Sequence, residues 1–150
     1  MVRSDFRGRR RAERRVRAGL WLMAVSTAVP GIWALIFPRA FFDDFPGFGF
    51  SWVRMLPPYN QHLTTDVGGF YLAFGVMFVV CAIKMDRRLS SVVIVGWLVF
   101  ALPHLIFHLA HLSELGSNDK VWQSVLLVSL VLLPAAMLVW ARRSERRYMH

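Results

Sequence analysis

The sequence contains little cysteine and few acidic residues. Cys81 is the only cysteine among 150 residues, which excludes an intramolecular disulfide and every CxxC metal or redox motif. Asp and Glu together number 9, against 18 Lys and Arg. No glycine-rich phosphate-binding loop, internal repeat or low-complexity tract occurs. These absences leave the long apolar runs as the main source of structural information.

Apolar residues dominate the chain, with 56% hydrophobic residues and a mean hydropathy of +0.45. Apolar runs lie near residues 19–37, 63–83, 91–112 and 121–141. Each has about the 20 residues that cross the hydrocarbon core of a bilayer as a helix. The short links 85–90 and 113–120 make the last three spans antiparallel to their sequence neighbours. The pattern predicts an all-α, four-helix transmembrane bundle that forms one integral membrane domain over residues 1–150.

The basic residues predict how this bundle is oriented. Segments 1–18, 84–88 and 142–147 carry 15 of the 18 Lys and Arg residues, and only Arg39, Arg54 and Lys120 fall in the other connections. Lys and Arg near span ends stay on the cytoplasmic side during insertion. We therefore expect both termini in the cytoplasm and the protein in the cell (inner) membrane of a bacterium.

The basic arm, residues 1–18, holds eight arginines. Such a cluster can neutralise nucleic-acid phosphates, but Phe6 is its only aromatic residue and a hydrophobic span follows directly. We expect anionic lipid headgroups as its partner and no nucleic acid. The following span is long and lacks a small-x-small cleavage site, so we expect it to be retained. Assembly into a homo-oligomer or a larger membrane complex stays open.

The connection between the first two spans, Pro38 to His62, is rich in aromatic residues. On the predicted topology it lies outside the cell. Aromatic rings favour the headgroup boundary, where an apolar face meets lipid and a polar edge meets water. We therefore expect the loop to lie flat on the outer surface as an aromatic belt. The alternative is a lid that covers a site.

Three histidines occur in the third predicted span, at residues 104, 108 and 111. Helical steps of four and three place His104, His108 and His111 on one face. Ionisable groups at membrane depth are expensive and usually mark a working site. We interpret this stripe as the main candidate site.

The second span contributes a second pair of polar residues. His62 and Asp66 are four residues apart and share a helix face, which continues through Gly69 and Ala73. Small residues at this spacing let a neighbouring helix approach closely, so we expect Asp66 to face the bundle. By helix rise, Asp66 lies level with His108 and His62 lies near His111.

Imidazoles and a carboxylate in this arrangement suit a divalent transition metal such as Zn, Fe, Mn or Cu. The mononuclear ligand set would be His62, Asp66, His108 and His111. His104 lies about 10 Å from His111 along the axis, too far to share an ion whose bonds are about 2 Å, and Glu114 would join only a second ion. Haem ranks lower, because only His62 lies off the third span. The alternative is that these groups hydrogen-bond one another across helices, at about 1 kcal/mol per bond.

The spaced polar residues also resemble a known pattern. Two segments carry it: Tyr59 to Leu63 with Asp66 and Gly68, and Leu102 to His104 with His108, His111 and Leu112. Together they resemble segments of uncharacterised small four-helix integral membrane proteins of actinobacteria. The resemblance covers roughly residues 50 to 115. It implies that these polar positions belong to one site, but it assigns no activity.

Two classes of function are compatible with a His/Asp cluster in a membrane bundle. The first is a metal-dependent site, open to the outer leaflet, that acts on or transports a small or lipid-like molecule. The second is a non-catalytic membrane subunit whose His/Asp cluster fixes helix packing or docks a partner. Proton or quinone handling by His104, His108 and Asp66 is a further alternative, because histidine titrates near physiological pH. No catalytic residue is identified, so whether the protein is an enzyme stays open.

Overall fold

The structure is a computed structural model that describes the backbone of residues 2–56 and 58–146 and the side chains of residues 10–56 and 58–139. Five α-helices make up most of it: α1 (Val2–Ile36), α2 (Pro38–Asp44), α3 (Gln61–Lys84), α4 (Arg87–Ala110) and α5 (Ser117–Arg146). A short antiparallel pair, β1 (Pro46–Gly47) and β2 (Phe50–Ser51), follows α2, and the 3-10 helix η1 (Leu112–Glu114) precedes α5. The all-helical prediction is confirmed.

Four of these helices are long and apolar enough to cross a membrane. Their apolar segments are Arg10–Ile36, Gln61–Lys84, Arg87–Ala110 and Ser117–Val139, with mean hydropathy between 1.7 and 2.2. They coincide with the four predicted spans. The basic arm is not a separate segment, because α1 already begins at Val2. The side chains of residues 1–7 and 9, and those of the arginines after residue 139, lie outside the described residues.

Side-chain caps determine where α3 and α4 begin. The side chain of Asn60 accepts a hydrogen bond from the Leu63 backbone N–H at 3.0 Å, and that of Asp86 accepts one from Leu89 N–H at 2.8 Å. These caps satisfy N–H groups that have no partner within the helix. Between the two helices, Met85 adopts a left-handed conformation with φ 51° and ends α3. The connection is therefore only two residues long, tighter than the predicted link of 85–90.

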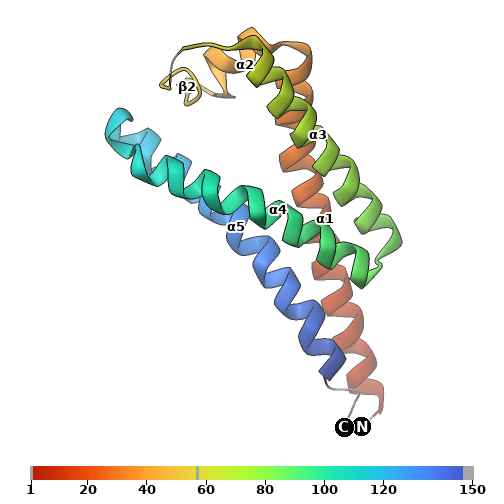
Figure 1. The fold of residues 1–150 in the computed structure, drawn as a ribbon. Coiled ribbons are helices and arrows are strands. Elements are labelled where there is room, and N and C mark those ends of the chain that lie inside the picture. The colour runs from red at the N-terminus through yellow and green to blue at the C-terminus, as the bar shows by residue number, and fades with distance from the viewer. Residues whose placement is uncertain (1, 57, 147–150) are drawn as a thin grey trace.

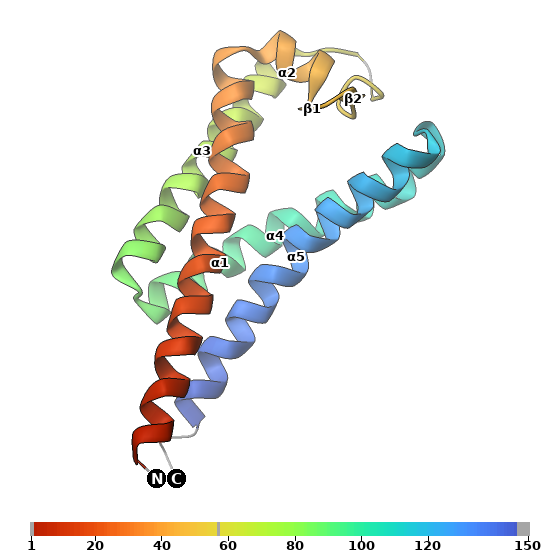
Figure 2. The same ribbon diagram turned by 180° about the vertical axis from the view of Figure 1, so that it is seen from behind.

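The helices form two pairs that diverge from each other. In Figure 1, α1 runs alongside α3, and α4 runs alongside α5. Figures 1 and 2 show that the pairs cross near the end of α3 and separate toward the end that carries α2 and the strands. The start of α1 and the end of α5 lie together at the opposite end. The axes of the two pairs therefore form a wedge that opens toward α2.

Glycine permits the close approach of α1 and α3. A Cβ atom built on Gly68 would lie 2.7 Å from the backbone nitrogen of Leu35, and one on Gly31 would lie 2.6 Å from that of Leu72. Real Cβ atoms do not come this close to another backbone, so glycine is required at both positions. The two backbones therefore pack directly against each other, with Gly68 on the packing face of α3.

The expected orientation of Asp66 is wrong. Its side chain is 61% exposed, and a Cβ atom on Gly69 would have no neighbour closer than 3.9 Å, so Gly69 is not at the tight contact. Gly68 sets the packing face, and Asp66, two residues earlier, is rotated from it by about 200° around the helix. Asp66 therefore points away from α1.

A cluster of aromatic side chains fills the region where the two pairs meet. Trp97 of α4 is 1% exposed, and its ring contacts those of Tyr71, Phe74, Phe78 and Phe100. Its indole N–H donates a 2.9 Å hydrogen bond to the carbonyl of Leu130 in α5. That carbonyl lacks a helical partner because Pro134, four residues later, has no N–H. Trp97 therefore satisfies this carbonyl and joins α4 to α5.

Candidate functional site

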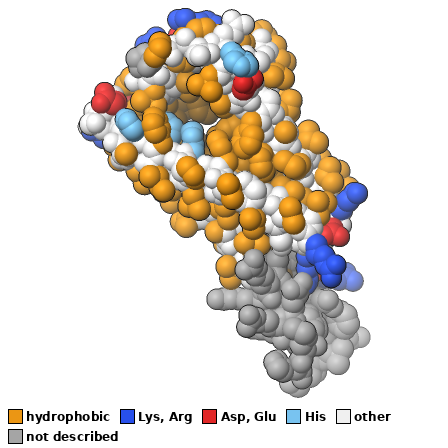
Figure 3. Space-filling model, viewed as in Figure 1, with side chains coloured by type: hydrophobic (Ala, Val, Ile, Leu, Met, Phe, Trp, Pro, Cys, Tyr) orange, Lys and Arg blue, Asp and Glu red, His pale blue; other side chains and the backbone are white. Residues whose placement is uncertain are grey.

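A cavity of about 530 Å³ lies between the two helix pairs. Its walls come from α1 and α3 on one side and α4 and α5 on the other, and they are mostly apolar. Figure 3 shows the corresponding hollow between the α2 region and α4, surrounded by hydrophobic side chains with histidine at one edge. The volume falls within the roughly 300–1,000 Å³ of typical small-molecule sites.

The segment that follows α1 covers this cavity. We call residues 37–56 the aromatic cap. Phe41, Phe42 and Trp52 of the cap are only 8%, 6% and 6% exposed, and all three line the cavity. Phe48, at the tip between the strands, is fully exposed. Three rings of the cap therefore form part of the cavity wall, while the tip of the cap points away from it. Whether the segment acts as a belt or as a lid stays a prediction from the sequence.

Two polar contacts hold the cap in place. The indole N–H of Trp52 donates a 2.8 Å hydrogen bond to Oδ1 of Asp119, in the first turn of α5. Within α2, Arg39 pairs with Asp43 at 2.7 Å and lies 5.0 Å from the ring centroid of Tyr59. The hydrogen bond from Arg39 to Asp43 raises the pKa of the guanidinium above its usual value. The cap is thus tied to α5 across the opening of the wedge.

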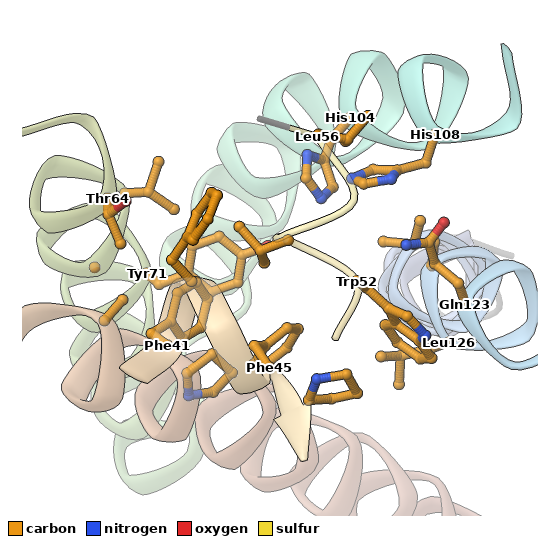
Figure 4. A pocket seen from close by; sticks show the side chains of 18 of the residues that line it. Phe41, Phe45, Trp52, Leu56, Thr64, Tyr71, His104, His108, Gln123 and Leu126 are labelled. Atoms are coloured by element: carbon orange, nitrogen blue, oxygen red, sulfur yellow. The ribbon is translucent and has the colours of Figure 1, made fainter. Parts of the chain in front are cut away.

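The main polar group of the cavity consists of His104, His108 and Gln123. The imidazole rings of His104 and His108 have centroids 4.6 Å apart, and His104 stacks on Phe100 at 5.2 Å. Figure 4 shows both rings pointing into the cavity from α4, with Gln123 of α5 beside His108. The spacing of four therefore places His104 and His108 on one face, as predicted.

Gln123 is the most deeply buried member of this group, with 3% exposure. Its side chain interacts with that of His108, but among the described residues no donor reaches the side-chain oxygen Oε1 at full hydrogen-bond geometry. An unsatisfied buried acceptor costs about 1–3 kcal/mol. Sequence reasoning missed Gln123, although it is the only carboxamide in the predicted span 121–141. A polar amide within a membrane span is itself a signal of an interhelical or ligand contact.

His111 departs from the predicted stripe because α4 ends at Ala110. The His111 side chain is exposed, its Nδ1 lies 2.8 Å from the Phe107 carbonyl, and its ring stacks on the Phe107 ring at 4.2 Å. His111 and Glu114 border a small side cavity of about 10 Å³, which shares Trp52, Leu56, His108 and Gln123 with the main one. Neither residue lines the main cavity.

His62 and Asp66 pair with each other outside the cavity. Their side chains are 87% and 61% exposed, and His62 Nε2 lies 3.4 Å from Asp66 Oδ2. Over the described part of the chain, no group of three or more His, Cys, Asp or Glu side chains is close enough to hold a metal ion. The structure thus brings His104 to His108 and His62 to Asp66, but it does not bring the four predicted ligands together. A metal ion stays a prediction from the sequence.

Comparison of the chain with protein-family models, with curated proteins and with solved structures gave no match. The function is therefore argued from the geometry of this site.

Proposed function

We propose that this is a multi-pass membrane protein that binds a lipid-like, amphipathic molecule in the cavity between its two helix pairs. The observation that carries the proposal is one large, mostly apolar cavity with the side chains of His104, His108 and Gln123 clustered in its wall. Apolar walls with a few convergent polar groups are the usual form of a small-molecule site.

The size of the cavity sets the size of the molecule. An apolar cavity of about 150 Å³ in a protein core accepts benzene, which has six carbon atoms. By the same proportion, 530 Å³ accommodates about 20 carbon atoms. This matches a single long hydrocarbon chain or an isoprenoid chain of similar length, and it is too small for a complete two-chain phospholipid.

The arrangement of the helices favours entry from the lipid phase. Leu126 of α5 lines the cavity and is 40% exposed, so part of the apolar wall is open to the surroundings. An apolar ligand would therefore leave the hydrocarbon phase of the bilayer without crossing water. The cavity lies toward the end opposite the start of α1 and the end of α5 (Figure 1). With both termini in the cytoplasm, as the arginine distribution favours, it opens in the outer leaflet.

In this proposal the aromatic cap and the polar group contact different parts of the ligand. Phe41, Phe42 and Trp52 cover the apolar part of the ligand, while His104, His108 and Gln123 hold its polar end. The hydrogen bond between Trp52 and Asp119 keeps the cap closed over the bound molecule. Binding or transfer of a membrane-soluble molecule is the function that these features support best.

The proposal is tested by the lipids that stay with the purified protein. The chain is purified in a mild detergent and washed with increasing detergent volumes, and the extracted lipid is identified by mass spectrometry. We expect one class of single-chain amphiphile to be retained at about one molecule per protein after surrounding phospholipid has been removed. Retained lipid that falls in parallel with phospholipid through the whole wash series contradicts the proposal.

A further inference from the structure

We propose that the polar end of the ligand is an uncharged hydroxyl group, so that the site selects long-chain or isoprenoid-type alcohols over acids, phosphates and hydrocarbons. This inference rests on the proposed function, because it names the chemical class that the same cavity accepts. Three observations support it: the absence of charge in the cavity wall, the hydrogen bonds already made by its polar residues, and the incompletely satisfied acceptor of Gln123 beside His108.

The lack of charged side chains in the cavity wall is the first feature that restricts the polar end of the ligand. No Lys, Arg, Asp or Glu occurs among the described residues that line the cavity. A charged headgroup loses its hydration free energy when it is buried in a low-dielectric site. Only an opposite charge in direct contact can compensate this loss. Arg39, the cation of α2, already pairs with Asp43 and does not line the cavity. A phosphate, sulfate, carboxylate or ammonium group is therefore disfavoured.

Most polar groups in the wall are already occupied. Thr64 Oγ1 donates to the Asn60 carbonyl, Asn60 Oδ1 accepts from Leu63 N–H, and Ser26 Oγ donates to the Leu22 carbonyl. Trp52 uses its only donor on Asp119. These residues are therefore satisfied within the protein. The capacity to bind a polar group falls to the imidazoles, to Gln123 and to the hydroxyl of Tyr71, which also lines the cavity.

The chemistry at Gln123 selects the kind of polar group. No donor reaches its Oε1 atom at full hydrogen-bond geometry among the described residues, and the side chain of His108 is its polar neighbour. The ring of His104 lies 4.6 Å from that of His108, centroid to centroid. A neutral imidazole offers one N–H donor and one nitrogen acceptor. A hydroxyl group both donates and accepts, so one alcohol can donate to Gln123 and accept from an imidazole N–H. An ether can only accept, and a hydrocarbon can do neither.

The test compares ligands that differ only at the polar end. The protein is reconstituted in phosphatidylcholine nanodiscs with a diazirine-bearing hexadecanol, which forms a covalent adduct on illumination. Unlabelled hexadecanol, hexadecyl methyl ether, hexadecyl phosphate and hexadecane then compete for the site, and the labelled fraction is measured by intact-protein mass spectrometry. We expect hexadecanol to compete about tenfold better than the methyl ether, because one hydrogen bond to a buried acceptor is lost. Hexadecyl phosphate and hexadecane should compete more weakly still.

A substitution at Gln123 isolates the contribution of its oxygen. In Gln123→Leu the preference for hexadecanol over the methyl ether should fall to about twofold or less. The variant should unfold at the same or a higher temperature in the absence of alcohol, because it removes an unsatisfied acceptor. Gln61→Leu is the matched control, since Gln61 is exposed at the start of α3 and does not line the cavity. Its preference for the alcohol should equal that of the wild type.

The outcomes separate this inference from the proposed function. Equal competition by hexadecanol and the methyl ether in the wild type overturns the hydroxyl assignment but leaves a lipid-binding cavity. Stronger competition by hexadecyl phosphate also overturns it. Failure of every one of the four compounds to compete overturns the proposed function itself. If Gln123→Leu does not fold, the comparison of the four compounds on the wild type still decides the assignment.

Discussion

Gly68→Ala is expected to destabilise the protein by about 1–3 kcal/mol, the usual cost of forcing an extra methyl group into a packed interface. The new Cβ atom would lie 2.7 Å from the Leu35 nitrogen and 3.0 Å from the Ala34 carbonyl carbon. Both neighbours are backbone atoms, so α1 and α3 would have to move apart. The effect is measured as a lower thermal unfolding temperature of the purified protein in detergent.

Gly69→Ala is the matched control, because it makes the same change one residue along the same helix. Its Cβ atom would meet nothing closer than the Leu35 Cδ1 atom at 3.9 Å, which is ordinary contact. Alanine is also favoured over glycine in a helix by up to about 1 kcal/mol. We expect Gly69→Ala to unfold at the same or a higher temperature than the wild type. Equal losses of stability in both variants would show that the packing face of α3 is misassigned.

Leu127→Trp is expected to reduce ligand retention strongly while preserving the fold. Leu127 of α5 lines the cavity, so the larger indole ring would occupy space that the ligand needs. The cavity volume of about 530 Å³ accommodates the ring without displacing a helix, so the unfolding temperature should stay close to that of the wild type. Retained amphiphile, measured by mass spectrometry after washing, should fall at least tenfold.

Leu132→Trp provides the comparison for this second variant. Leu132 lies on the same helix, is 62% exposed and does not line the cavity. It undergoes the same substitution, so any general effect of an added tryptophan on detergent or lipid binding appears in both variants. We expect Leu132→Trp to retain as much amphiphile as the wild type. An equal loss in both variants would mean that the retained molecule binds the outer surface.

The helices were predictable from the sequence because their physical cause is local. An apolar run of about 20 residues must satisfy its backbone hydrogen bonds internally in lipid, which only a helix does. The caps at Asn60 and Asp86 likewise depend on residues within three positions of each helix start. The pairing of His104 with His108 follows from helical spacing alone. These features do not depend on how the helices pack.

The packing of the helices was not predictable in the same way. In a membrane, side chains that face lipid and side chains that face a cavity are both apolar, so hydropathy does not distinguish them. The prediction placed Gly69, and not its neighbour Gly68, on the packing face of the helix. As a result, the Asp66 side chain was wrongly expected to face the bundle. The heptad spacing of Gly68 and Gly75, which both lie against α1, was the available signal.

The polar part of the cavity was only half predictable. The histidine spacing identified His104 and His108, but Gln123 lies on another helix and becomes a partner only through the tertiary arrangement of α4 and α5. The role of Trp52 likewise depends on Asp119, 67 residues later in the chain. No local pattern indicates contacts of this kind.

The most direct test of the account is a map of the residues that the diazirine-bearing hexadecanol labels in nanodiscs, obtained by digestion and peptide sequencing with mass spectrometry. A ligand in the cavity should place most adducts on lining residues such as Val67 and Leu127. Excess unlabelled hexadecanol should remove these adducts. Adducts that instead concentrate on the exposed residues Val92, Val99 and Leu132, and that resist competition, would contradict a binding cavity between the two helix pairs.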